Sequence, residues 1–366
     1  MVPSRGIRLV GLALAATLSV NCQVRAQTVD EAIQQSRALV LDFMAESATP
    51  GLSVAVHFRG DLVWAEGFGL ANVEYEVPVT TGTRFRIGSI SKSLTSAAVG
   101  LLYERGELDL DAPVQTYVPS FPEKEYPITT RHIGGHLSGI PHYGPRDFQN
   151  FVVYRDVVSA LDKFKDRPLL FRPGERFQYS SFGWNLMSAV VESASGRPYL
   201  ELMHDEVFEP LGMQDTMADD YRAIIPNRTG FYERRSGELT NAPFTDNSDV
   251  WAGGGFLSTP TDLVIFLHGL LSEELLSAGT LDVLFTPMLM TDGARTEYGL
   301  GWGIREDSHG HPEIGHGGGH YGATARLAAL PDHELIVAVT ANMSGARYGD
   351  VFGEILRRFG VLEDGS

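Results

Sequence analysis

Cysteine is almost absent from the sequence, which contains only Cys22. This residue falls within 1–26, a segment with the features of a secretory signal peptide: a basic start, the short apolar run 9–20, and small residues before a predicted cleavage after Ala26. Cleavage there removes the thiol, which excludes disulfides and a cysteine nucleophile from the remaining chain. A lipid anchor on Cys22 is the alternative, and Asn21 disfavours it because such processing prefers a small residue at that position.

Long apolar runs and positive charge are scarce as well. After the leader, no run reaches the roughly 18 apolar residues that a membrane helix needs, so we expect no membrane span. The chain has 29 Lys and Arg against 46 Asp and Glu, a formal net charge of −17, and loss of the leader's three arginines takes this to −20. Such a charge repels phosphate backbones, so we expect no nucleic acid partner. The leader predicts a periplasmic or secreted protein, and its oligomeric state stays open.

The distribution of strand and helix signals predicts how the chain is organised. Its 366 residues are 43% hydrophobic, enough for a large core. Strand-like runs cluster near both ends of the sequence, at 53–58, 62–68, 298–305, 323–330 and 335–342. The intervening residues instead have helical periodicity and loops rich in proline and glycine. We therefore expect an α/β (α+β) fold, with a sheet-containing lobe at about 27–108 and 291–366 and a mainly helical lobe inserted at about 109–290.

Four helices are predicted from apolar residues at helical spacing. They cover 30–46 behind Asp30 as N-cap, a segment from Ile90 to near Gly106, 182–194, and 349–359. A cleft between the two predicted lobes is the expected place for a functional site.

Ser89 and Lys92 stand at the start of the second of these helices. Residues three apart share a helix face, so the amine of Lys92 can reach the Ser89 hydroxyl. A serine hydroxyl is a weak nucleophile until a base takes its proton, and Lys92 can serve if desolvation lowers its pKa. The helix N-terminus favours the negative charge that forms when the hydroxyl attacks a carbonyl. Without further context, such a tetrapeptide is most often a helix cap followed by a solvated lysine.

Two later segments supply that context. Tyr179 and Ser181 come just before a helix, where Tyr179 as phenolate could relay the serine proton, although a tyrosine packed between lobes is the alternative. A glycine run then precedes a predicted strand, and it consists of His316, Gly317, Gly318 and Gly319. Glycines allow a close backbone approach and leave N–H groups that point into a site, whereas the alternative is an ordinary glycine loop.

Together these segments resemble the three signatures of the serine beta-lactamase-like and penicillin-binding protein family, which includes class C beta-lactamases, related esterases and D-peptidases. The signatures here are Phe85–Lys92 (FRIGSISK), the Tyr179 motif and His316–Gly318. Similar framework segments are 129–143, 209–213, 251–266 and 298–302, and the resemblance spans about 37–359. A narrower similarity, to the mitochondrial serine beta-lactamase-like protease of animals, rests on 90–95, 121–126 and 241–256. Because of the leader, we interpret the chain as a bacterial relative of that protease.

The resemblance implies the beta-lactamase and transpeptidase fold, an antiparallel sheet flanked by helices with an inserted helical lobe. It implies a secreted serine hydrolase that needs no cofactor. Ser89 would be the acylated nucleophile, Lys92 its activator, and Tyr179 a base that also serves the leaving group. The N–H groups of Ser89 and Gly319 would form the oxyanion hole.

Two departures from the family pattern affect the expected substrate. Ser181 stands where beta-lactamases commonly have asparagine, and His316 where many have lysine, so an amide and a fixed cation are both lost. We therefore favour a small peptide, amide or ester substrate, with a true beta-lactamase or D-alanyl peptidase as the alternative. A non-catalytic binding or scaffold protein on the same fold is the alternative from another class.

A metal site is the remaining alternative, because His309, His311, His316 and His320 fall close together. The segment 307–312 instead has the composition of a hairpin loop, and no His-Glu-x-x-His motif occurs, so we expect no metal.

Aromatic candidates for the pocket wall are Tyr143, Phe182, Trp251 and Tyr321.

Overall fold

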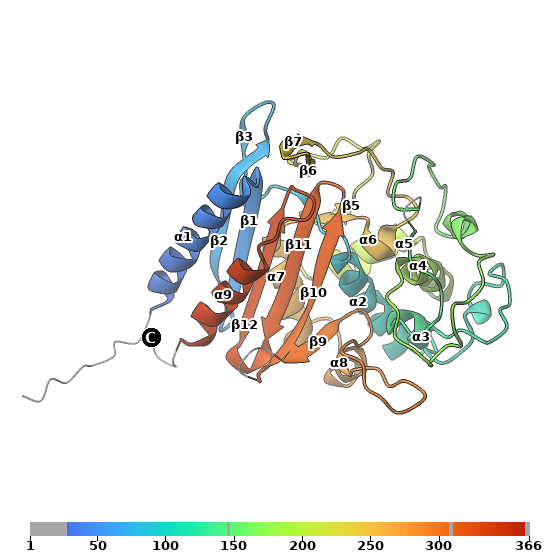
Figure 1. The fold of residues 1–366 in the computed structure, drawn as a ribbon. Coiled ribbons are helices and arrows are strands. Elements are labelled where there is room, and N and C mark those ends of the chain that lie inside the picture. Colours follow the sequence, from blue (N-terminus) through green and yellow to red (C-terminus); the bar gives the residue numbers. More distant parts are fainter. Residues whose placement is uncertain (1–27, 145–146, 307–309, 363–366) are drawn as a thin grey trace, which may run out of the picture.

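The structure, a computed structural model, describes residues 28–144, 147–306 and 310–362 (Figure 1). The predicted signal peptide over 1–26 lies outside the described residues, and so does His309. None of the described helices combines the length and the apolar character needed to cross a membrane.

Both ends of the chain build one seven-stranded antiparallel sheet, in the order β3-β2-β1-β12-β11-β10-β9 (Figure 1). Its strands are β1 Gly51–Phe58, β2 Asp61–Asn72, β3 Val77–Pro78, β9 Gly303–Glu306, β10 Pro312–His320, β11 Ala323–Leu330 and β12 Leu335–Ala341. At its centre β1 pairs with β12, from Leu52 opposite Ala341 to Phe58 opposite Leu335. The prediction of one sheet assembled from both ends of the sequence is confirmed.

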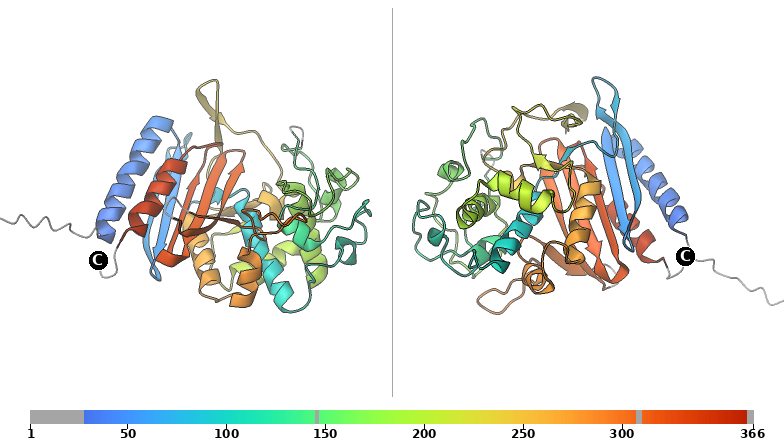
Figure 2. Two further views of the ribbon diagram at one scale, coloured as in Figure 1. Left: turned by 60° about the horizontal axis from the view of Figure 1, so that its bottom comes forward. Right: turned by 180° about the vertical axis from the view of Figure 1, so that it is seen from behind.

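Side chains that alternate along β1 divide the core between the two faces of the sheet. Val54 and Val56 pack in the cluster that includes α1 (Val29–Ser47) and α9 (Gly349–Gly360). Ala55 belongs to the larger cluster on the other face, with α2, α7, α8 and the second lobe. Figure 2 shows α1 and α9 together on one side of the sheet. Because β1 and β12 are covered on both faces, all their residues are buried.

The first helix begins one residue earlier than predicted, and its N-cap is Thr28 rather than Asp30. The Thr28 hydroxyl accepts the Glu31 N–H at 3.2 Å, and the Glu31 carboxylate accepts the Thr28 N–H at 3.1 Å. This reciprocal pair satisfies two backbone donors, which a lone Asp30 cap would not.

The second lobe consists of short helices and long irregular connections. Its helical segments are α3 Thr130–Gly134, α4 Ser181–Ser195, α5 Tyr199–Leu202, α6 Trp251–Gly254, and the turns η1 Val114–Thr116, η2 Ser159–Lys163 and η3 Met203–Phe208. Two small sheets join β4 Phe85–Arg86, β8 Phe256–Ser258 and β5 Met217–Ala218, and β6 Tyr232–Arg235 with β7 Glu238–Asn241. The helix predicted over 182–194 corresponds to α4, which ends at Gly196 in the left-handed conformation.

Part of the predicted helical lobe lies on the sheet instead. Helix α7 (Pro260–Leu271) packs against β1 and β12, and α8 (Ala278–Phe285) packs against α2 (Ile90–Glu104). The boundary expected at 290 is therefore wrong for these two helices. Neither helix was predicted from the sequence, and helical periodicity alone does not say which neighbour covers an apolar face.

The glycine run precedes strand β11, as predicted, but it also lies within a strand of its own, β10, which was not predicted. It allows β10 to touch the start of α2: a Cβ on Gly318 would lie 1.9 Å from the Ile87 carbonyl oxygen. A Cβ on Gly88, whose φ is +49°, would lie 2.7 Å from the Gly319 nitrogen. Glycine on both sides of this contact brings the backbone of β10 against the residue that precedes Ser89.

We predict that Gly318→Ala destabilises the protein, because the added methyl meets backbone that has no room to yield. Overpacking of this kind costs about 1–3 kcal/mol, measured as a fall in the free energy of unfolding. Gly317→Ala is the matched control, since a Cβ there meets nothing within 4 Å. Equal stability of the two variants would contradict the close approach.

Candidate active site

Ser89 stands at the N-terminus of α2, and its side chain does not cap the helix. Its hydroxyl makes no cap hydrogen bond, and Lys92 is fully buried, so the ordinary interpretation of a cap followed by a solvated lysine is wrong. The Lys92 amine lies 3.0 Å from Ser89 Oγ and 2.5 Å from the carbonyl oxygen of Gly253 in α6. The structure thus brings together the nucleophile and activator that the sequence predicted.

The environment of Lys92 favours its neutral form. No carboxylate of the described residues pairs with Lys92, and burial holds the pKa of the amine well below its usual value. A neutral amine can donate a hydrogen to Gly253 and accept one from the Ser89 hydroxyl. Burial therefore favours the neutral amine, which is the form of Lys92 that can act as a base.

Tyr179 lies beside this pair, with its ring centroid 5.0 Å from Lys92 Nζ. Burial raises the pKa of the phenol, and a hydrogen-bonding contact with the Ser89 side chain opposes this rise only in part. The phenolate expected from the sequence is therefore disfavoured at neutral pH. Burial therefore favours a neutral phenol at Tyr179, and it makes the Lys92 amine the better candidate for the base.

Two histidines hold the segment around Tyr179. His136 Nδ1 accepts the Ser180 N–H and His142 Nδ1 accepts the Ser181 N–H, both at 3.1 Å. Burial lowers the pKa of both imidazoles, so each is a neutral ring with its proton on Nε2. The His136 ring lies 4.1 Å from the ring of Tyr179. Both histidines lie in the framework segment 129–143, and nothing in the sequence indicated their role.

A pocket of about 150 Å³ opens in front of Ser89. Ser181, which is 5% exposed, and Gly319 line it, as do Tyr179 and the unpredicted His142. The rest of its wall is formed by Tyr143, Phe148, Thr245, Asp246, Asn247, Asp249, Val250, Gly253, Gly254 and His320. The N–H of Ser89 has no acceptor among the described residues, so it is available to a substrate oxygen.

A second pocket, of about 350 Å³, lies on the other side of Tyr179 and contains His316 and Gly317. His316 Nε2 is 2.8 Å from the hydroxyl of Tyr298, and burial lowers the pKa of His316 to about 3, so this imidazole is neutral. Arg305 and Arg326 also line this pocket. Of the glycine run, Gly319 therefore faces the Ser89 pocket, Gly317 faces the second pocket, and Gly318 contacts Ile87.

The four aromatic residues predicted for the pocket wall lie in different places in the structure. Tyr143 lines the Ser89 pocket, and Tyr321 packs against Phe148, which also lines it. Phe182 is fully buried in the core, and Trp251 lines a separate hollow at the surface. The sequence did not distinguish them because packing and ligand contact use the same residue types.

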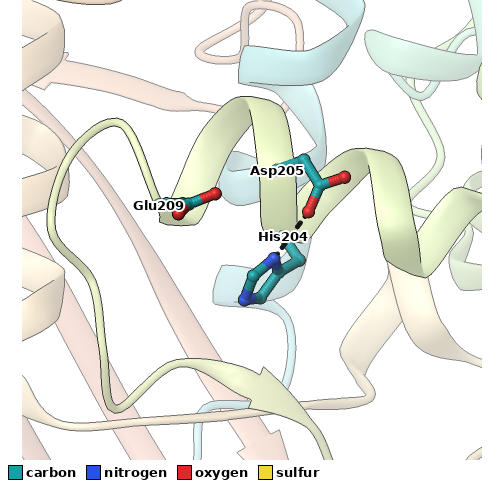
Figure 3. A group of neighbouring side chains, drawn as sticks. All are labelled: His204, Asp205 and Glu209. Atoms are coloured by element: carbon teal, nitrogen blue, oxygen red, sulfur yellow. Dashed lines mark hydrogen bonds and ion pairs between the residues drawn. The ribbon is translucent and has the colours of Figure 1, made fainter.

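One group of described residues has the geometry for a metal ion, and it lies away from the predicted site. His204, Asp205 and Glu209 are exposed, with ligand atoms within 4.8 Å of one another (Figure 3). Asp205 already forms ion pairs with Arg197 at 2.5 Å and with His204 at 2.7 Å. Exposed acidic groups of this kind are common without an ion, and none of the three lines the Ser89 pocket.

Comparisons with known proteins agree with this geometry. The family model described as Beta-lactamase matches residues 36–354. The chain belongs to the beta-lactamase family. It is 34% identical to the human mitochondrial serine beta-lactamase-like protein LACTB, over 82% of this chain and 72% of that protein. A D-aminopeptidase of Gluconobacter oxydans is 28% identical over 81% of this chain and 57% of its own length.

A solved structure supports the same assignment. The octameric penicillin-binding protein homologue from Pyrococcus abyssi superimposes with a TM-score of 0.78 and 28% identity, covering 89% of this chain and 76% of that one. The family and fold that the sequence motifs indicated are therefore confirmed.

We predict that Ser89 acylation falls as the pH is lowered, because protonation of Lys92 removes the base. Since burial lowers the pKa of Lys92 well below its ordinary value of 10.5, the rate should reach its plateau well below pH 10 and decline on the acid side. Lys92→Arg places a permanent cation there and should reduce acylation at least about 100-fold at every pH. The measurement is a pH profile of kcat/KM with an activated ester.

Lys165→Arg is the control, since Lys165 pairs with Asp162 at the surface. A rate that instead begins to rise only near pH 10 would show that Lys92 is an ordinary ammonium in the free enzyme.

Proposed function

We propose that this protein is a secreted serine hydrolase that cleaves peptide, amide or ester bonds through an acyl-enzyme on Ser89. The observation that carries the proposal is the buried, carboxylate-free Lys92 amine 3.0 Å from Ser89 Oγ. Stability alone does not explain a lysine at this position, because burial of an amine is unfavourable and a hydrophobic side chain would not have that cost.

In the proposed reaction, Ser89 Oγ attacks the scissile carbonyl while its proton passes to the Lys92 amine. The N–H groups of Ser89 and Gly319 stabilise the oxygen that becomes negative. Collapse of the tetrahedral intermediate breaks the bond to the leaving group, which takes a proton from the Tyr179 phenol. Tyr179 recovers its proton from the Lys92 ammonium. Water then hydrolyses the ester on Ser89, and the amine and phenol return to their starting states.

The substrate preference follows from the polar groups beside Ser89. Ser181 presents a hydroxyl where an asparagine amide would hold the side chain of a beta-lactam, and His316 is neutral where a lysine would meet its carboxylate. Both features favour peptide, amide or ester substrates over penicillins. The similarity to a D-aminopeptidase is consistent with amide cleavage.

A beta-lactamase or D-alanyl peptidase activity is the second candidate, and one observation favours it. Arg305 and Arg326 line the pocket on the far side of Tyr179, where the carboxylate of such a substrate could be bound in place of a lysine contact. Arg326 is partly occupied by Glu313 at 3.0 Å, and Arg305 has a looser contact with Glu297 at 3.7 Å.

The proposal is tested by intact mass spectrometry after brief exposure to p-nitrophenyl esters, a fluorophosphonate, D-alanyl peptides and penicillins. We expect an ester or fluorophosphonate adduct on the wild-type protein, and Ser89→Ala should abolish it because the nucleophilic oxygen is lost. Penicillin should acylate at least about 10-fold more slowly than the ester, given the missing cation and amide. If no reagent modifies Ser89, the chain is a binding protein on a hydrolase fold.

A further inference from the structure

Asp246 is a buried carboxylate in the wall of the Ser89 pocket, and it forms no salt bridge with a described residue, although the charge of Arg222 acts on it from a distance. It is 4% exposed. One of its oxygens accepts the N–H of Ser248 at 2.9 Å and the Ser248 hydroxyl. The other oxygen has no hydrogen-bond partner among the described residues. The nearby Arg222 is exposed and chelates Asp220, with both bonds at 2.9 Å.

The neighbouring buried carboxylates are neutralised, which sets Asp246 apart. Asp249 pairs with Lys163 at 2.6 Å, and Asp219 lies between Arg86 at 2.6 Å and Arg228 at 3.3 Å. A buried charge is strongly unfavourable unless a counter-charge or hydrogen bonds compensate it. Each of these two carboxylates has a salt bridge, whereas Asp246, which lines the pocket, has none among the described residues.

Asn247 supplies a second and independent sign of a ligand. Its Nδ2 donates to Asp219 at 2.8 Å, which fixes the orientation of the amide and makes the other atom the carbonyl oxygen. That oxygen is buried, has no hydrogen-bond partner in the described chain, and belongs to a residue that is 3% exposed and lines the same pocket. Buried polar atoms are almost always paired, so an unpaired acceptor at a pocket indicates a donor that comes from outside.

Two acceptor oxygens in residues of the pocket wall therefore lack a donor among the described residues, which suits a ligand group with several hydrogens and a positive charge. An ammonium has these properties, and a carboxylate, phosphate or neutral carbonyl does not. Tyr143 and Phe148 add aromatic rings to the wall, which are compatible with a cation. The volume of about 150 Å³ is close to that of a cavity that holds one benzene ring, so it accommodates a single residue.

We propose that the Ser89 pocket binds the free α-ammonium group of an aminoacyl substrate through Asp246 and Asn247. This inference rests on the proposed hydrolase function and narrows it to removal of one N-terminal residue from a peptide or amide. Ser181 and Gly319 line the same pocket, which places the acyl part of the substrate there. The leaving group then extends past Tyr179 toward His316.

The test compares alanine and phenylalanine p-nitroanilides, as both enantiomers, with a free or an acetylated amine. Wild-type kcat/KM should be at least about 10-fold higher for the free amine in at least one pair. Asp246→Asn keeps an acceptor for Ser248 and removes the charge, so it should reduce this free-to-acetylated ratio about 10- to 100-fold, as expected for loss of one charge-assisted contact. Asp350→Asn removes an exposed carboxylate on α9, which does not line the pocket, and should not change the ratio.

A binding measurement covers the case in which Asp246→Asn does not fold. On the wild-type protein, phenylalaninamide should inhibit ester hydrolysis at least about 10-fold more strongly than N-acetylphenylalaninamide. An equal or reversed preference for the acetylated compounds would overturn the ammonium inference. The fluorophosphonate separates the two failures: Ser89 labelled without amine preference refutes only the ammonium site, whereas an unlabelled Ser89 refutes the hydrolase itself.

Discussion

The burial of one amine is the constraint on which the rest of this structure depends. Lys92 has no exposed surface, and almost the whole of α2 is buried around it. A lysine is held in such a place only if a large apolar environment surrounds it and a few oxygen atoms accept its hydrogens. The sheet, α4 and α6 supply that environment together, since α2 packs against both α4 and α6 and contacts β10 and β11. The carbonyl oxygen of Gly253 comes from α6, so the second lobe completes the surroundings of a side chain that the first lobe provides.

Tyr179 separates two hollows with different chemical character. On one side are Ser89, a short carboxylate-bearing wall and the end of β10, and on the other are neutral His316 and two arginines. The side chains that contact the two halves of a substrate therefore come from largely different segments. Of the described residues, only Tyr179 lines both hollows, which in the proposed reaction suits the group that exchanges a proton at the bond between the halves.

The sequence revealed the residues whose spacing or motif has a chemical reason. Ser89 and Lys92 were found because residues three apart in the sequence share a helix face. Strands β1, β2, β11 and β12 were found from their apolar runs. Strand β10 was not predicted, because its glycines have no side chains that could form the alternating pattern of a strand. Gly253 was missed because its role belongs to a backbone carbonyl, which every residue has. Asp246 was missed because the lack of a salt bridge among the described residues is a property of tertiary packing. The burial that disfavours the phenolate form of Tyr179 is another such property, since it cannot be predicted from a single motif.

The pairing of β1 with β12 has a consequence for how the chain acquires its shape. The Gly51 N–H donates to the Asn342 side chain across 291 residues of sequence, and β1 lies between β2 and β12 in the finished sheet. During synthesis, β1 and β2 therefore emerge long before the strand that covers their open edge. Contacts of such long range form late and slowly. A nascent chain of this protein therefore has no complete sheet until residues 335–341 have been made.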